Sequence, residues 1–232
     1  MGKDVIVACD FAGKAQTLEF LDQFTGRKPF VKIGMELFYA EGPDIVREIK
    51  ARGHRIFLDL KLHDIPNTVK SAMRVLTGLG VDIINVHAAG TKAMMAAALE
   101  GLTREDGSRP LLIAVTQLTS TDQRAMEEDL WIDRPLEDVV MHYAKCAGEA
   151  GLDGVVCSPL EAKAVHETCG EGFLTVTPGV RFAESAAGDQ KRIMTPAQAK
   201  LEGCDYIVVG RPITRAEDPV AAYERCCREF ID

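Results

Sequence analysis

Short runs of apolar and β-branched residues recur along the whole chain, and a longer amphipathic stretch follows each of them. Short runs rich in Val and Ile predict buried strands, whereas apolar positions spaced three and four residues apart predict helices. The predicted strands are residues 5–9, 30–34, 55–62, 83–87, 111–117, 154–158, 174–177 and 206–209. The predicted helices are residues 15–24, 43–52, 68–78, 91–102, 136–150, 159–169, 196–202 and 218–230.

Eight strand–helix units in 232 residues predict a (β/α)8 barrel, the TIM barrel of the α/β class, formed as one domain over residues 1–232. A doubly wound open sheet is the alternative. It is disfavoured because no Gly-x-Gly-x-x-Gly or Walker loop follows the first predicted strand. The chain has no internal repeat, low-complexity tract or linker that would divide it.

The third predicted strand carries charged residues inside an apolar run. Asp59 and Lys61 lie two positions apart, so on a strand their side chains project from the same face. Asp64 follows at the point where the strand pattern ends. Apolar residues on both sides of the alternation indicate a strand covered on both faces. A surface ion pair is the ordinary alternative, but charges on a covered strand are costly to desolvate and therefore favour a functional role.

A barrel places its active site at the carboxyl ends of its strands, so polar residues at those ends are candidates for chemistry. Several predicted strands end in titratable or hydrogen-bonding side chains. The residues at or just beyond these ends are Asp10, Asp59, Lys61, Asn85, His87, Thr119 and Ser120, and Lys32 lies within the second strand. We therefore expect them to converge on one site.

The loops after the last two predicted strands each contain an arginine. Gly210 and Arg211 follow the eighth strand, where such barrels commonly bind phosphate through backbone N–H groups and a charged side chain. Arg181 follows the seventh strand, before a loop rich in small residues that suits a mobile lid ending near Gln190. A turn glycine beside a surface arginine is the alternative for residues 210–211. Two converging arginines favour phosphate.

Charge and cysteine content limit the partners. A net charge of −8, with both signs interspersed, disfavours nucleic acid or an anionic membrane as a partner. The seven cysteines show no Cys-x-x-Cys pair, no zinc-type spacing with the five histidines and no preceding secretory segment, so we expect reduced thiols in a cytoplasmic protein. No apolar run reaches the roughly 20 residues that span a bilayer.

Taken together, these motifs resemble the orotidine 5'-monophosphate decarboxylase family over essentially the whole chain. The segment Asp59-Leu-Lys61-Leu-His-Asp64-Ile-Pro-Asn-Thr68 is highly specific for it. The other matching segments are Val7-Ala-Cys-Asp10, Val31-Lys32-Ile-Gly, Val115-Thr-Gln-Leu-Thr119-Ser120, Thr177-Pro-Gly-Val-Arg181, Gln190 and Val209-Gly210-Arg211-Pro-Ile. We find no departure at a position that the family uses.

The resemblance implies decarboxylation of orotidine 5'-monophosphate to uridine 5'-monophosphate in pyrimidine synthesis, with no cofactor and no metal. Lys61 would stabilise and protonate the carbanion at pyrimidine carbon 6. Lys32, Asp59, Lys61 and Asp64 match the family's charged tetrad, with Asp64 entering the neighbouring subunit's site, so a homodimer with shared sites is implied. The ribose would be contacted by Asp10 and Lys32 and, across the subunit boundary, by Thr68. The pyrimidine edge would be contacted by Thr119 and Ser120. The phosphate would be bound by Arg181, Gln190, Gly210 and Arg211.

Two other functions remain open. A magnesium-dependent sugar-phosphate decarboxylase of the same barrel group, such as keto-gulonate 6-phosphate decarboxylase, resembles this chain in its Asp-x-Lys-x-x-Asp strand but has a metal-binding Glu where this chain has Lys32. Glu36, on the following segment, is interpreted as a solvated helix residue. A non-catalytic barrel that binds a phosphate ligand would have no reason to keep Lys61 between carboxylates. His63 and His87 are expected to pack or hydrogen-bond rather than react.

Overall fold

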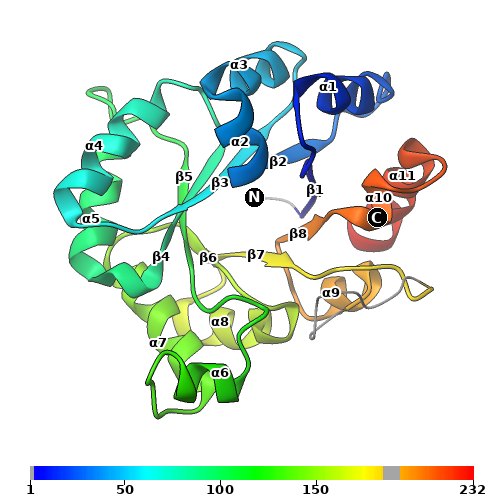
Figure 1. Cartoon of the computed structure of the whole chain (residues 1–232). Helices are drawn as coiled ribbons and strands as arrows, with labels where there is room; N and C mark the ends of the chain where they lie inside the picture. Colours follow the sequence, from blue (N-terminus) through cyan, green and yellow to red (C-terminus); the bar gives the residue numbers. More distant parts are fainter. Residues whose placement is uncertain (1–2, 185–193) are drawn as a thin grey trace.

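The computed structural model of the chain describes residues 3–184 and 194–232, and its eight parallel strands close into a barrel (Figure 1). Each strand pairs with the next, and the first pairs with the last through Asp4 opposite Tyr206. The strands are β1 (Asp4–Ala8), β2 (Phe30–Gly34), β3 (Ile56–Leu62), β4 (Ile83–His87), β5 (Leu111–Val115), β6 (Gly154–Val156), β7 (Leu174–Pro178) and β8 (Tyr206–Val209). The predicted (β/α)8 barrel is confirmed, and the open-sheet alternative is wrong.

Helices surround the barrel on its outer face (Figure 1). They are α1 (Lys14–Asp22), α2 (Met35–Glu41), α3 (Pro43–Ala51), α4 (Pro66–Thr77), α5 (Thr91–Leu102), α6 (Gln123–Glu128), α7 (Leu136–Glu149), α8 (Ala162–Cys169), α9 (Pro196–Leu201), α10 (Arg211–Thr214) and α11 (Pro219–Phe230), with short 3-10 helices η1 (Ala88–Gly90) and η2 (Pro159–Glu161). The sequence pattern missed α2, α6, α10 and η1. Each has seven residues or fewer, which is too short to show a helical period.

Prolines mark several of the helix starts that the pattern predicted within one or two residues. Pro43, Pro66, Pro196 and Pro219 each occupy the first turn of a helix. Proline is tolerated there because the N–H that it lacks would have no intrahelical partner. Pro66 thus helps to turn the chain from β3 into α4.

The strands separate two apolar clusters. The larger cluster lies between the strands and the surrounding helices and includes Leu58 and Leu60. The smaller cluster fills the barrel interior and includes Phe57. Alternate residues of β3 therefore face opposite cores, so the strand is covered on both faces as its apolar flanks predicted.

No described helix is long and apolar enough to cross a membrane. Among the described residues, the cysteines form no disulfide.

Candidate active site

The interior of the barrel changes from apolar to polar toward the carboxyl ends of the strands. The apolar cluster in the barrel interior includes one residue from each of β2, β3 and β4, namely Phe30, Phe57 and Ile83. Two residues further along each strand, the pleat returns the side chain to the same face. The residues at these next inward positions are Lys32, Asp59 and Asn85. A polar layer therefore lies directly above the apolar filling.

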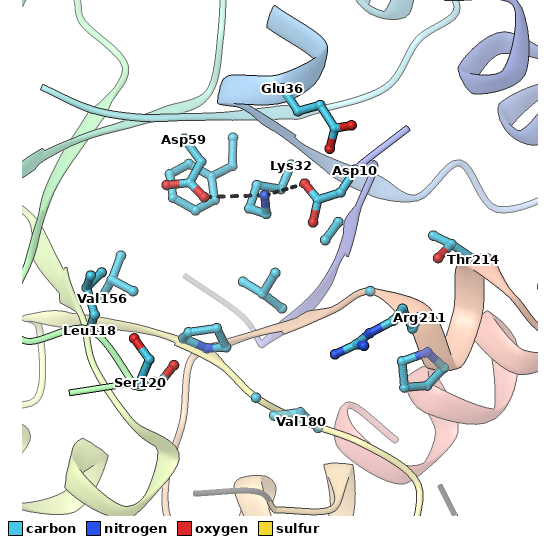
Figure 2. Close-up of a pocket in the computed structure, with 18 of the residues that line it drawn as sticks. Asp10, Lys32, Glu36, Asp59, Leu118, Ser120, Val156, Val180, Arg211 and Thr214 are labelled. Atoms are coloured by element: carbon cyan, nitrogen blue, oxygen red, sulfur yellow. Dashed lines mark hydrogen bonds and ion pairs between the residues drawn. The ribbon is translucent and has the colours of Figure 1, made fainter. Parts of the chain in front are cut away.

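Four charged side chains alternate in sign across this layer. Lys32 Nζ lies 3.0 Å from Asp10 Oδ1 and 3.3 Å from Asp59 Oδ2. Lys61 Nζ lies 2.7 Å from the other oxygen of Asp59, Oδ1. Figure 2 shows Lys32 between Asp59 and Asp10. The predicted convergence of residues 10, 32, 59 and 61 on one site is thus present in the structure.

The two buried members of this row stabilise each other's charge. Burial alone would raise the pKa of Asp59, but the opposite charges of Lys32 and Lys61 outweigh it and hold that pKa below its ordinary value. Burial alone would lower the pKa of Lys32, but Asp59 and Asp10 outweigh it and hold that pKa above its ordinary value. Both groups are therefore charged near neutral pH.

β3 departs from a regular strand at the point where it carries its ammonium group. Lys61 has a φ of 53°, in the left-handed region that non-glycine residues rarely adopt. The pairing with β4 shifts register between Leu58 and Leu62. The sequence predicted a regular strand here, so the left-handed residue and the register shift are departures from that prediction. The departure is confined to this part of β3, because the Lys61 side chain still contacts Asp59. Asn85 Oδ1 accepts a hydrogen bond from Lys61 N at 2.8 Å.

A cavity of about 900 Å³ opens above this layer. It brings together most of the residues that the sequence singled out, from the ends of six different strands. The predicted site residues that line it are Asp10, Lys32, Asp59, Lys61, Thr119, Ser120, Arg181, Gly210 and Arg211. Its volume lies within the range of small-molecule sites.

The basic part of the cavity lies opposite the row of alternating charges. Figure 2 shows Arg211 across the cavity from Lys32 and Asp59. Arg181 is 9% exposed, and its backbone N–H is bonded to the carbonyl oxygen of Met194. Arg211 begins α10, directly after Gly210. The cavity thus has the charged row on one side and Arg211 on the other, and Arg181 is also part of its wall.

Sequence reasoning missed several residues of the cavity wall. Gln16, Thr214 and Arg215 also line it, as does Gln117, which lies in the matching segment 115–120 but was given no role. Arg215, four residues beyond Arg211, could have been found from the same loop. Glu36 does lie on a helix and is exposed, as interpreted, but it also lines the cavity, because the unpredicted helix α2 starts directly at the end of β2.

Two site residues implied by the resemblance, Asp64 and Thr68, do not line this cavity. Asp64 and Thr68 are exposed, and they belong to a run of exposed residues from 63 to 68. Asp64 Oδ1 accepts a hydrogen bond from Ile65 N at 2.6 Å, and within the described residues no ion pair joins it to Lys61. Gln190 lies outside the described residues, as does most of the predicted lid loop.

The two histidines beside the site pack on each other. The ring centroids of His63 and His87 are 5.7 Å apart. Burial, followed by His63 and Lys61, holds the pKa of His87 below its ordinary value, so His87 is neutral near pH 7. Within residues 3–184 and 194–232, no group of three His, Cys, Asp or Glu side chains is arranged to hold a metal ion.

A family model described as orotidine 5'-phosphate decarboxylase / HUMPS matches residues 3–226 of the chain. The chain belongs to this family. The resemblance seen in the motifs is therefore confirmed.

Named relatives within the family are similar over nearly their full length. Orotidine 5'-phosphate decarboxylase from Geobacillus thermodenitrificans is 57% identical over 97% of this chain and 95% of its own. The protein of the same name from Bacillus caldolyticus is 58% identical over 97% of this chain and 93% of its own. A crystal structure of orotidine 5'-phosphate decarboxylase from Lactobacillus acidophilus has a TM-score of 0.88 at 43% identity, covering 99% of this chain and 100% of that one. A crystal structure of an uncharacterized conserved protein from Geobacillus kaustophilus has a TM-score of 0.87 at 52% sequence identity, covering 97% of this chain and 99% of that one.

Proposed function

We propose that this protein decarboxylates orotidine 5'-monophosphate to uridine 5'-monophosphate, without a cofactor. The observation that carries the proposal is the Lys61 ammonium, held 2.7 Å from Asp59 at the carboxyl end of β3 in a cavity that Arg181 and Arg211 also line. The names of relatives at 57–58% identity support the same reaction.

The cavity suits a nucleotide in one orientation. Arg181, Gly210 and Arg211 would bind the phosphate, together with Gln190. Asp10 and Lys32 would hold the ribose hydroxyls, because they continue the charged row on the side of Asp59 away from the reacting amine of Lys61. Thr119 and Ser120, on the loop after β5, would contact the pyrimidine edge. Carbon 6 of the pyrimidine would then face Lys61.

The reaction needs strong stabilisation of negative charge. When the bond from carbon 6 to the carboxylate carbon breaks, carbon dioxide leaves and the electron pair stays on carbon 6 as a poorly delocalised carbanion. The Lys61 ammonium stabilises this charge as it forms and then donates its proton to carbon 6. Asp59 keeps the amine charged and aimed before reaction starts, so little reorganisation is needed. Binding of the distant phosphate supplies energy for closing the site and excluding water.

We infer that the complete site needs two copies of the chain. Asp64 and Thr68 lie on an exposed segment directly beyond β3, where they do not reach their own cavity. This segment can enter the site of a second protomer, so Asp64 would give Lys61 a second carboxylate neighbour and Thr68 would reach the ribose. A symmetric homodimer would then contain two shared sites.

The wider setting is part of the same proposal. We infer one barrel domain over residues 1–232, because the strands that close the barrel run from Asp4 to Val209 and α11 follows the last of them. The net charge of −8 supports a small anionic substrate bound in a locally basic cavity rather than nucleic acid or a membrane. Cysteines without disulfides support a cytoplasmic location.

The decisive experiment is an assay with orotidine 5'-monophosphate, followed by the loss of its ultraviolet absorbance and by chromatography of the product. We expect stoichiometric uridine 5'-monophosphate and carbon dioxide at the same rate with and without a chelator. Loss of this activity in the chelator would show that the reaction needs a metal ion and would contradict the cofactor-independent mechanism. Binding of the nucleotide without turnover would favour a non-catalytic barrel.

A further inference from the structure

Asn85 lies on β4, beside Asp59 and Lys61, and its side chain is fully buried below the cavity. It bonds to both of these residues at once. Its Nδ2 donates to Asp59 Oδ1 at 2.7 Å, and its Oδ1 accepts from Lys61 N at 2.8 Å. We propose that Asn85 is a positioning residue that holds the Lys61 backbone and the Asp59 carboxylate in the arrangement needed for decarboxylation. This inference rests on the proposed function.

The geometry leaves one orientation for the Asn85 amide. Only the oxygen can accept from the Lys61 N–H, so the nitrogen must face Asp59. The carboxylate oxygen that it meets, Oδ1, also accepts from Lys61 Nζ. The amide therefore closes a ring of contacts that runs through the Asp59 side chain, the Lys61 ammonium and the Lys61 backbone.

The irregularity in β3 explains why a side chain is needed at this point. Between Leu58 and Leu62 the pairing with β4 shifts register, so Lys61 is not matched with a β4 residue there. Its left-handed φ of 53° also has to be held by the surroundings. Asn85 supplies the acceptor that the strand ladder does not provide. Its side chain thus substitutes for a backbone pair and fixes the direction in which Lys61 leaves the strand.

Asn85 also orients the Asp59 carboxylate between two cations. With Oδ1 held by Asn85 and Lys61, Oδ2 is directed at Lys32, 3.3 Å away. The charged and titratable groups facing Asp59 are thus Lys32 from β2, with Asp10 beyond it, Lys61 from β3 and His87 from β4. Burial alone would raise the pKa of Asp59, and the hydrogen bond from Asn85 is, after Lys32 and Lys61, one of the contacts that hold that pKa below its ordinary value. Removing it should raise that pKa.

The test compares Asn85→Ala, which loses both bonds, with the isosteric Asn85→Asp, which keeps an acceptor for Lys61 N–H. Thr175→Val is the control: Thr175 is equally buried and its hydroxyl makes two hydrogen bonds, both with Asp205, away from the charged row. For Asn85→Ala we expect kcat to fall about a hundredfold with KM changed less than about threefold, because a small displacement of the reacting group affects the chemical step most. We also expect the acid limb of kcat/KM to move to higher pH.

The Asn85→Asp variant gives a readout that a purely structural role would not produce. When protonated, the introduced carboxyl group can donate to Asp59 as the amide does; when ionised, it repels Asp59. The two carboxyl groups would titrate as a coupled pair. Activity relative to the normal protein should therefore be highest at low pH and fall as the pair ionises. Wild-type kcat and an unshifted pH profile in both variants, as expected for Thr175→Val, would overturn the proposal even if their melting temperatures fell.

A second measurement separates this proposal from the proposed function. Trace acetylation of Lys61 with acetic anhydride, read by mass spectrometry, reports the accessibility of the amine without any turnover. We expect faster acetylation in Asn85→Ala than in the unaltered protein and in Thr175→Val. If the unaltered protein fails to decarboxylate the nucleotide but this difference is found, the function is wrong and the positioning role stands. Equal acetylation rates would reject the positioning role.

Discussion

Lys61 Nζ lies 2.7 Å from Asp59 Oδ1, although the Lys61 backbone is left-handed and the two residues are not on a regular stretch of strand. Holding a non-glycine residue in this conformation costs about 1 kcal/mol or more. The contact is therefore maintained against a local backbone preference. Strain of this kind is concentrated at functional sites, where the surrounding structure over-determines it.

Removal of the Lys61 amine should separate catalysis from backbone strain. We expect both Lys61→Ala and Lys61→Gly to lose decarboxylation by orders of magnitude, because neither can stabilise or protonate the carbanion. Lys61→Gly should nevertheless be about 1 kcal/mol more stable than Lys61→Ala, since glycine adopts a positive φ freely. Orotidine 5'-monophosphate turnover and urea denaturation measure the two effects. Turnover near normal in either variant would reject the role of Lys61.

Acid should destabilise the protein partly through Asp59. Because the pKa of Asp59 is held below its ordinary value, its contribution to stability is complete above the ordinary carboxyl range near pH 4 and is lost as the pH falls through the lowered pKa. Asp59→Asn should be about 3 kcal/mol less stable at pH 7. Its melting temperature should also change less than that of the unaltered protein between pH 5 and about pH 2. Asp44→Asn, at an exposed ion pair with Arg47, is the control and should keep the normal pH dependence.

Gly34 should be needed for space rather than for backbone freedom. A Cβ at this position would lie 3.1 Å from both Asp10 Oδ1 and Lys32 Nζ, which are themselves in contact. Gly34→Ala should therefore displace this pair and lower kcat/KM about tenfold or more, with little loss of stability. Gly26→Ala is a matched control, because a Cβ there meets nothing within 4 Å. Steady-state kinetics of the two variants that are indistinguishable would contradict this expectation.

The Arg211 side chain should act through the phosphate. Loss of a charged hydrogen-bonding partner in Arg211→Ala should raise KM for the nucleotide by about tenfold to a hundredfold. The nucleoside orotidine, which has no phosphate, should bind and react equally in the variant and in the unaltered protein. Arg124→Ala, at an exposed pair with Glu128, should leave both substrates unaffected. A comparable loss with orotidine would show that Arg211 does not bind the phosphate.

Hybrid dimers should test the shared site. Lys61→Ala and Asp64→Asn should each reduce activity, and mixing them should restore some of it if the two residues meet across the subunit boundary. After random reassociation of equal amounts, about half of the dimers are mixed and each has one intact site, so about a quarter of normal activity should return. A mixture with no more activity than its two components would place both residues in the same protomer's site. Mixing Lys61→Ala with Lys61→Gly is the control and should restore nothing.

Local sequence patterns predicted three features of this protein. These are the eight strand–helix units, the apolar residues that cover both faces of β3, and the projection of Asp59 and Lys61 from the same face of that strand. They depend on periods of about two and 3.6 residues and on the rule that barrels act at the carboxyl ends of their strands. These signals lie within single elements, so no knowledge of their neighbours is needed. The short helix α2 gave no such signal, and with it the position of Glu36 on the cavity wall was missed.

The contacts between residues on different strands are determined only by the tertiary structure of the closed barrel. The left-handed Lys61, the Asn85 amide that bridges it to Asp59, and the lack of space above Gly34 all depend on the register between β2, β3 and β4. The sequence alone places Asp59 and Lys61, which have opposite charges, on the same face of one strand, because side-chain direction along a strand is a local property. Their distances and orientations come from packing between strands that are far apart in the sequence, which no local period encodes.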